Sequence, residues 1–126
     1  MTRIEHILIA TIALCCGFAE PGVARADPGR GADVFDTQCA ECHSVKPGKN
    51  RKGPSLFAVM GRRAGTADGF NYSDGIKSSG IVWSEKTVAD YISAPRAVVP
   101  QGKMKFDGKL TPAETADLIG FLTSLR

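Results

Sequence analysis

The sequence predicts an all-α fold, in which helices near both ends of one domain flank a loop-rich middle. Apolar residues close to the two ends recur at three- and four-residue intervals, which is the spacing of one helix face. We find no useful length of alternating apolar and polar residues, and therefore expect no strand. The length of 126 residues and an ordinary composition, 43% hydrophobic and 23% charged, favour one globular domain over a disordered chain or a multi-span membrane protein.

Residues 1–26 are predicted to be a secretory signal peptide that is cleaved after Ala26. An apolar run over 7–16 is followed by Ala24-Arg25-Ala26, whose small residues have the spacing that a signal peptidase recognises. The run is short for a bilayer span, and a retained membrane anchor is the alternative. We therefore expect an exported, periplasmic protein whose mature domain, residues 27–126, contains two cysteines and one histidine.

The first half of this domain is predicted to contain one long helix and two short helical segments. Asp27-Pro28 fits an N-cap followed by proline at the first helical position, and a helical spacing of apolar residues follows it. Residues 46–53 form a charged loop interrupted by glycine and proline. We expect one or two helical turns over 55–60, and then a glycine-rich loop that contains a short helix near 73–78.

Two further helices are predicted in the second half. Ser84 fits an N-cap, and the apolar helix face that follows it ends before Pro95. Thr111 and Glu114 have the spacing of a capping box, with Pro112 at the first helical position. The last helix carries an apolar stripe, which is formed by Leu118, Ile119, Phe121, Leu122 and Leu125.

The strongest chemical signal is the run Cys39-Ala40-Glu41-Cys42-His43. A Cys-x-x-Cys-His run is the attachment signature of c-type haem. Two thiols three positions apart on a helical turn can each add to one haem vinyl group, and the adjacent imidazole can bind the iron. We therefore predict one covalently bound haem c, with Cys39 and Cys42 as thioethers and His43 as an axial ligand.

Three other interpretations of the two cysteines remain open at this point. A thioredoxin-type disulfide would follow a strand in a βαβ unit, and we expect no strand here. A zinc site needs four ligands, whereas the mature chain offers three Cys and His groups within five residues. A purely structural cysteine pair is the third, although exported proteins more often pair distant cysteines.

The second axial ligand is predicted to be a methionine, because the mature domain has no other histidine. Met60 ends the apolar run 56–60, where methionine usually fills gaps in a core. Met104 instead follows Pro100 in a segment without helical periodicity, so that a loop can present its sulfur. We predict that Met104 is the ligand and Met60 a core residue.

Beyond this motif, the mature chain resembles a class I c-type cytochrome, similar to mitochondrial cytochrome c and bacterial periplasmic cytochrome c2. The resemblance covers nearly all of residues 29–126. Gly31 and Phe35 match the N-terminal helix of the family, which crosses the C-terminal helix through Leu118 and Phe121. The resemblance implies three to five helices wrapped around one covalently bound haem, with the terminal helices packed together.

Short motifs imply further haem contacts by the same resemblance. Pro54, in Gly53-Pro54-Ser55-Leu56, matches the proline beside the axial histidine, and Tyr91 matches the tyrosine near the methionine sulfur. Buried haem propionates need hydrogen-bond donors, which Arg62, Tyr72 and Trp83 would supply. The full implied set of cofactor-binding residues is Cys39, Cys42, Pro54, Arg62, Tyr72, Ser73, Trp83, Tyr91 and Phe106.

Two positions depart from the pattern of the family. Ile76 stands where the family often has an asparagine that helps to hold an internal water. Gly102 stands where a hydroxyl residue often meets a propionate. Both changes remove polar contacts, so we expect an altered hydrogen-bond network around the haem and unchanged iron ligands.

Basic residues lie on both sides of the predicted haem. The formal net charge of +3 is a mild excess, below what a nucleic-acid-binding protein needs. A positive collar around the haem edge would attract redox partners with acidic docking surfaces. The residues of this collar are Lys46, Lys49, Arg51, Lys52, Lys103, Lys105 and Lys109.

We expect a monomeric one-electron carrier rather than an enzyme, because two protein ligands leave the iron no open position for a substrate. The resemblance implies partners such as a cytochrome bc-type complex, a terminal oxidase or a photosynthetic reaction centre. Two alternatives are a dedicated electron acceptor of one periplasmic dehydrogenase, and a haem enzyme or gas binder from whose iron Met104 detaches.

Overall fold

The computed structural model describes residue 22 and residues 24–126, and most of the predicted signal peptide lies outside the described residues. The described part contains no strand, and its one isolated bridge joins Arg63 to Val82. No helix within it is both long enough and apolar enough to cross a bilayer. The helices are α1 (Pro28–Gln38), α2 (Asp74–Lys77), α3 (Glu85–Ser93), α4 (Pro95–Val98) and α5 (Pro112–Ser124).

The predicted helix starts are confirmed, each by a side-chain cap. The Asp27 carboxylate accepts hydrogen bonds from the first backbone N–H groups of α1. Ser84 and Thr87 form a capping box at the start of α3. Thr111 and Glu114 form another at the start of α5. These caps bind backbone N–H groups that have no partner within the helix, which is why α1, α3 and α5 begin at these residues.

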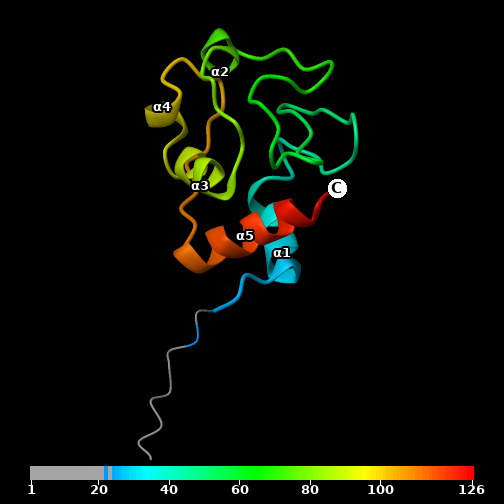
Figure 1. Cartoon of the computed structure of the whole chain (residues 1–126), viewed down its shortest axis with the longest axis vertical. Helices are drawn as coiled ribbons and strands as arrows, with labels where there is room; N and C mark the ends of the chain where they lie inside the picture. Colours follow the sequence, from blue (N-terminus) through cyan, green and yellow to red (C-terminus); the bar gives the residue numbers. More distant parts are fainter. Residues whose placement is uncertain (1–21, 23) are drawn as a thin grey trace, which may run out of the picture.

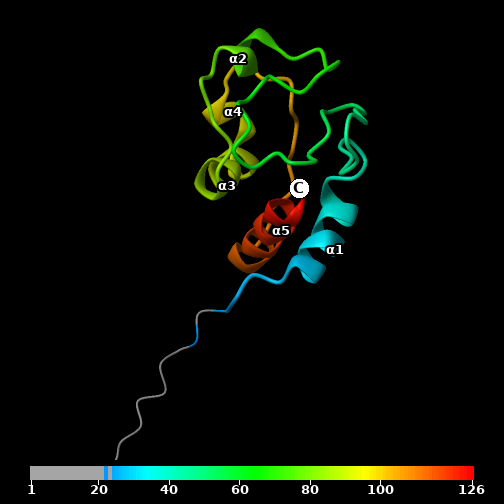
Figure 2. The same cartoon turned by 45° about the vertical axis from the view of Figure 1, so that its right-hand side comes forward.

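The first and last helices cross side by side, below the loops and the short helices (Figures 1 and 2). At the crossing, a side chain at Gly31 would collide with the backbone carbonyl of Asp117, so glycine lets the two helices approach closely. The rings of Phe35 and Phe121 pack against each other with centroids 5.8 Å apart. The predicted packing of the terminal helices is therefore confirmed.

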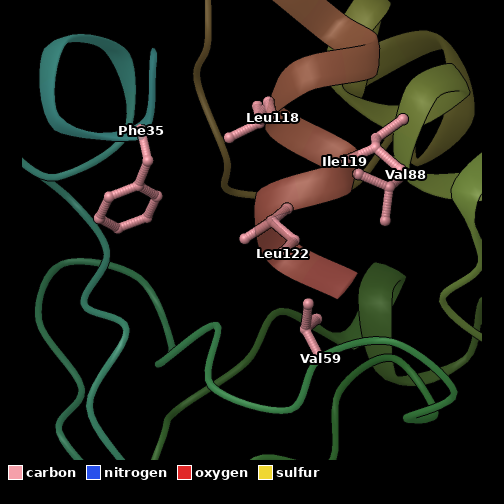
Figure 3. Packing of buried hydrophobic residues seen from close by; sticks show 6 residues of the cluster. All are labelled: Phe35, Val59, Val88, Leu118, Ile119 and Leu122. Atoms are coloured by element: carbon pink, nitrogen blue, oxygen red, sulfur yellow. The ribbon is translucent and has the colours of Figure 1, made fainter. Parts of the chain in front are cut away.

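A buried apolar cluster joins these two helices to the rest of the domain (Figure 3). Phe35 comes from α1, Val88 from α3 and Val59 from the loop before α2. The other members lie on α5, and Leu118 has only 2% of its surface exposed. The cluster consists of Phe35, Val59, Val88, Leu118, Ile119 and Leu122.

The expected helical turns over 55–60 are wrong. Pro54 precedes the segment, the backbone N–H of Leu56 donates to the carbonyl of Ser44, and Ala58 has a positive φ of 50°. A left-handed residue cannot continue a right-handed helix, and only a single turn closes, from the N–H of Val59 to the carbonyl of Leu56.

The predicted end of a helix before Pro95 is confirmed, but the structure contains a second helix that begins there. Helix α3 ends at Ser93, but Pro95 itself begins the short helix α4. Proline suits the first turn of a helix because the N–H that it lacks would have no partner there. The sequence prediction missed this helix.

Beyond the turn at Gln101, the segment 102–111 contains no helix and alternates between partly buried and exposed residues, which corrects the expectation that no such alternation exists. Its odd-numbered residues are exposed and its even-numbered residues are partly buried, as the period of two in an extended chain requires. Met104 and Phe106 therefore face the domain, while Lys103 and Lys105 face solvent.

Candidate haem site

A cavity of about 600 Å³ lies where α1, α3, α5 and the intervening loops meet, and its lining is mainly apolar. This volume is in the range of small-molecule and cofactor pockets. All eleven residues that the sequence analysis assigned to the haem line this one cavity: Cys39, Cys42, His43, Pro54, Arg62, Tyr72, Ser73, Trp83, Tyr91, Met104 and Phe106.

The two methionines occupy different environments. Met104 lines the cavity, presented by the extended segment before α5. Met60 is not among the lining residues and packs against the apolar core cluster. The position of each methionine thus agrees with the role predicted for it.

The two cysteines follow directly on α1, within one tight turn. The backbone N–H groups of Cys42 and His43 both donate to the carbonyl of Cys39, at 3.1 and 2.9 Å. Both thiols are free, which argues against a disulfide between them. Among the described residues no three His, Cys, Asp or Glu side chains form a cluster that could hold a metal ion.

The protonation of these groups follows from their burial. Burial, and to a smaller extent the nearby Cys42, raises the pKa of the Cys39 thiol to about 11. Burial lowers the pKa of His43 below its usual range, and this outweighs the opposing effect of its hydrogen bond to Pro54. The cavity therefore holds a neutral imidazole at neutral pH, the form that binds metals.

The imidazole of His43 is oriented by the loop that follows it. Its Nδ1–H donates to the carbonyl of Pro54 over 2.7 Å, which leaves the lone pair of Nε2 free. A Cβ at Gly53 would lie 2.7 Å from Nδ1, so this position has room only for glycine beside the ring. The N–H of Gly53 donates in turn to the carbonyl of Cys42 at 2.7 Å, which ties the loop to the cysteine turn.

Two residues that the sequence analysis missed hold this loop in place. Asn50 is hydrogen-bonded through both atoms of its side-chain amide, and Ser55 through its N–H, its carbonyl and its hydroxyl. Both lie in or beside a loop rich in glycine and proline, where Asn and Ser side chains commonly bind backbone groups. That composition was the available signal, but it does not specify which backbone groups are bound.

Arg62, Tyr72 and Ser73 line the cavity with polar groups that also bind the surrounding backbone. The Arg62 guanidinium donates to the carbonyls of Phe57 and Ser55, at 3.2 and 2.8 Å. The Tyr72 hydroxyl accepts from the N–H of Ala67 at 3.0 Å, which leaves its own O–H free to donate. The Ser73 hydroxyl oxygen accepts from the N–H of Ile76 and so caps α2.

Aromatic residues form another part of the wall. Trp83 and Tyr91 pack with ring centroids 5.1 Å apart, and burial raises the pKa of the Tyr91 hydroxyl.

The two departures from the family pattern, Ile76 and Gly102, have structural roles beside the cavity. Ile76 lines the cavity and packs in a small buried cluster with Val99, and the N–H of Gly102 closes a turn onto the carbonyl of Val99.

Cationic side chains lie at the edge of the cavity. Lys52, Lys103 and Lys105 are exposed and also contribute to its lining. Lys52 pairs with Glu41 at 2.6 Å, so part of its charge is compensated locally. Lys103 and Lys105 take part in none of the ion pairs found among the described residues.

The residues present fit a haem. An apolar cavity of cofactor size, two free thiols on one turn, a neutral imidazole with a free Nε2 and a thioether are the donor set of a c-type site. Fold and site together define a helical protein built around one covalently attached haem. A family model described as cytochrome c matches residues 29–126, and the chain belongs to the cytochrome c family.

The relatives include proteins from bacteria and plants. The chain is 42% identical over 121 residues to cytochrome c2 of Rhodomicrobium vannielii, covering 95% of this chain and 96% of that one. It is 41% identical over 110 residues to cytochrome c2 of Rhodopila globiformis, covering 87% and 100%. It is 40% identical over 105 residues to cytochrome c of Ginkgo biloba, covering 82% and 89%. The chain is thus a class I cytochrome c that carries electrons on one covalently bound haem c.

Proposed function

We propose that this protein shuttles single electrons between redox proteins of the periplasm, with His43 and Met104 as the two iron ligands and Cys39 and Cys42 as the thioether attachments. The observation that carries the proposal is that His43, with its Nε2 lone pair free, and Met104 line the same apolar cavity. When bound, the haem supplies a one-electron ferrous–ferric couple.

The protein residues contribute ligation, exclusion of water and charge compensation. Phe106 and the apolar core residues around it keep water away from the iron-binding side chains. Arg62, Tyr72 and Trp83 supply hydrogen-bond donors for the haem carboxylates, which a buried charge requires. With His43 and Met104 both holding the iron, no position would remain open for a substrate, and we therefore infer a carrier and not an enzyme.

The partners we propose are redox proteins with acidic docking surfaces, such as a cytochrome bc-type complex as donor and an oxidase or a photosynthetic reaction centre as acceptor. Support comes from Lys103 and Lys105, which are exposed beside the cavity. Positive charges around the site of electron exit speed the encounter with an acidic surface. The carrier works as a monomer, exported with cleavage of residues 1–26, and binds no nucleic acid.

The ligand assignment is tested by comparing Met104→Leu with Met60→Leu. Ferric haem with a methionine sulfur ligand has a weak far-red charge-transfer band. We expect this band in the native protein and in Met60→Leu, since a Met-to-Leu exchange in a core conserves volume. We expect its loss in Met104→Leu, together with rapid binding of added cyanide or imidazole.

The same measurement separates the carrier from a haem enzyme or gas binder. A native ferric protein at neutral pH that lacks the band and binds small ligands rapidly has an open iron position, and that result would contradict the proposal. If the band disappears in Met60→Leu instead, Met60 is the ligand and not Met104.

A further inference from the structure

One peptide group links the imidazole of His43 to the side chain of Asn50. The carbonyl of Pro54 accepts the Nδ1–H of His43 at 2.7 Å. The N–H on the other side of the same planar peptide, that of Ser55, donates to Oδ1 of Asn50 at 2.9 Å. The imidazole, the peptide and the amide therefore form an unbroken chain of two hydrogen bonds.

The orientation of the Asn50 amide is set by its other end. Its Nδ2–H donates to the carbonyl of Asp68 at 2.9 Å, in the loop before α2. An amide has one acceptor oxygen and one donor nitrogen, and these two bonds use them in the only compatible way. Neither a carboxylate nor an apolar side chain of this shape can make both bonds.

The peptide itself has no freedom to turn away from the histidine. The Ser55 hydroxyl donates to the carbonyl of Lys46 at 2.6 Å, and Arg62 donates to the Ser55 carbonyl at 2.8 Å. Ser55 is buried, with 4% of its surface exposed, so water does not replace these bonds. The peptide between Pro54 and Ser55 is held in a fixed position toward His43.

Hydrogen bonds in such a chain polarise one another. When the N–H of a peptide donates a hydrogen bond, electron density shifts toward the carbonyl oxygen of the same peptide. That oxygen then becomes a better acceptor. A stronger bond from Nδ1–H makes the imidazole a more basic, more electron-donating ligand. A more donating ligand stabilises the ferric state over the ferrous state.

We propose that Asn50 is a positioning residue that lowers the reduction potential of the haem iron by strengthening, through the peptide between Pro54 and Ser55, the hydrogen bond of His43. This inference rests on the ligation of iron by His43 proposed above. Asn50 is a loop residue that acts on the imidazole only through this peptide, and the inference assigns it a defined effect on the electron affinity of the haem site.

The test uses the holoprotein and the variant Asn50→Leu, which removes both bonds at nearly equal volume. We expect a more positive midpoint potential in redox titration and an upfield shift of the His43 Nδ1–H resonance in the NMR spectrum of the ferrous protein. Faster hydrogen exchange of the Ser55 amide shows that the bond to Asn50 has been lost. The proton resonance responds to the hydrogen bond itself, so it separates this effect from a general change in polarity.

A matched control is Thr111→Ala, which breaks the capping box of α5 and lowers stability without touching the cavity. Its potential and its His43 resonance should equal those of the native protein. An Asn50→Leu protein with faster Ser55 exchange but an unchanged potential and an unchanged resonance would overturn the inference.

A second variant, Asn50→Asp, covers the case in which Asn50→Leu does not fold. It keeps an acceptor for the Ser55 N–H and loses the donor to Asp68, so the His43 resonance should stay in place or move downfield. An upfield shift would overturn the inference as well. Absence of the far-red methionine band, or of the signals of an iron-bound histidine, in the native protein would instead refute the proposed ligation. Failure of the ligation is therefore distinguishable from failure of the inference about Asn50.

Discussion

The backbone N–H of Asp27 donates a 2.7 Å hydrogen bond to Oδ1 of Asp117, across 90 positions of the chain. The other carboxylate oxygen of Asp117 accepts from Nε of Arg30 at 2.9 Å. Asp117 is buried on α5, with 6% of its surface exposed, and therefore ties the start of α1 to α5. The hydrogen bond from Arg30, followed by that from Asp27, holds the pKa of the Asp117 carboxyl below its ordinary value.

This lowered pKa predicts how the stability depends on pH. A carboxyl with a lower pKa in the folded state stabilises the fold above its unfolded pKa of about 3.9, and the contribution is lost as the pH falls through the folded pKa. Asp117→Asn should therefore be less stable than the native protein in urea at neutral pH, and the difference should shrink below about pH 4. Asp36→Asn, on the exposed face of α1, is the control, with little effect at either pH. A deficit in Asp117→Asn that is the same at all pH values would contradict the prediction.

Cleavage after Ala26 would change the group that meets Asp117. The N–H of Asp27 would become an α-ammonium beside a buried carboxylate, and hydrogen bonds between charged partners are stronger than neutral ones. Mass spectrometry of the exported protein should give a chain that begins at Asp27. That chain should unfold at a higher urea concentration than one that keeps Ala26, and the advantage should disappear in Asp117→Asn. An advantage that survives in this variant would rule out the ammonium as its cause.

Gly31 controls the closest approach of α1 to α5. A methyl group there would meet the backbone carbonyl of Asp117 and lie 2.7 Å from Cβ of Phe121. Neither is a flexible side-chain end, so Gly31→Ala should cost about 1–3 kcal/mol in the free energy of unfolding, the usual penalty of overpacking. Gly29→Ala adds the same methyl group to the same helix 3.1 Å from Oδ1 of Asp27, where only a side-chain oxygen has to shift, and should cost less. Helix propensity alone would favour alanine at both positions, so equal effects in the two variants would show that the helix crossing does not set the cost.

Electron transfer to an acidic partner should depend on salt. The association rate should fall by on the order of tenfold as the ionic strength is raised from low to physiological values, because salt screens the lysines beside the cavity. Lys103→Gln and Lys105→Gln should reduce this dependence in stopped-flow measurements. Lys86→Gln is the control, since Lys86 pairs with Asp90 on α3 and does not line the cavity. A rate that does not change with salt would exclude the proposed collar.

Local sequence was sufficient for the helix starts. Asp27, Ser84 and Thr111 act on backbone groups two or three residues away, so their effect is readable from neighbouring letters. The haem-attachment motif was recognisable for the same reason, because its two thiols and its imidazole lie within five consecutive residues on one turn.

The wrong prediction at residues 55–60 concerns a segment whose backbone is bonded to a distant partner. Residues 55–60 have helix-forming composition, but the N–H of Leu56 is bound by Ser44, and Ala58 is left-handed. The alternation over 101–111 is present in the sequence, yet glycines interrupt it and no neighbouring strand pairs with it. Local patterns do not report a bond such as that from Leu56 to Ser44, because it forms between loops that only the folded chain brings together.

The sequence alone therefore established the all-α class, the positions of the main helices and the chemistry of residues 39–43. The sequence also predicts Met104 rather than Met60 as the ligand, but how Met104 reaches the cavity, and which amide supports the peptide that orients His43, depended on the folded chain. The physical reason is the separation along the chain of the residues that make each contact. A cap or a Cys-x-x-Cys-His turn is built by contacts between near neighbours, whereas Met104 meets the cavity, and Asn50 meets Asp68, only because the core and the crossing of α1 and α5 hold distant loops side by side.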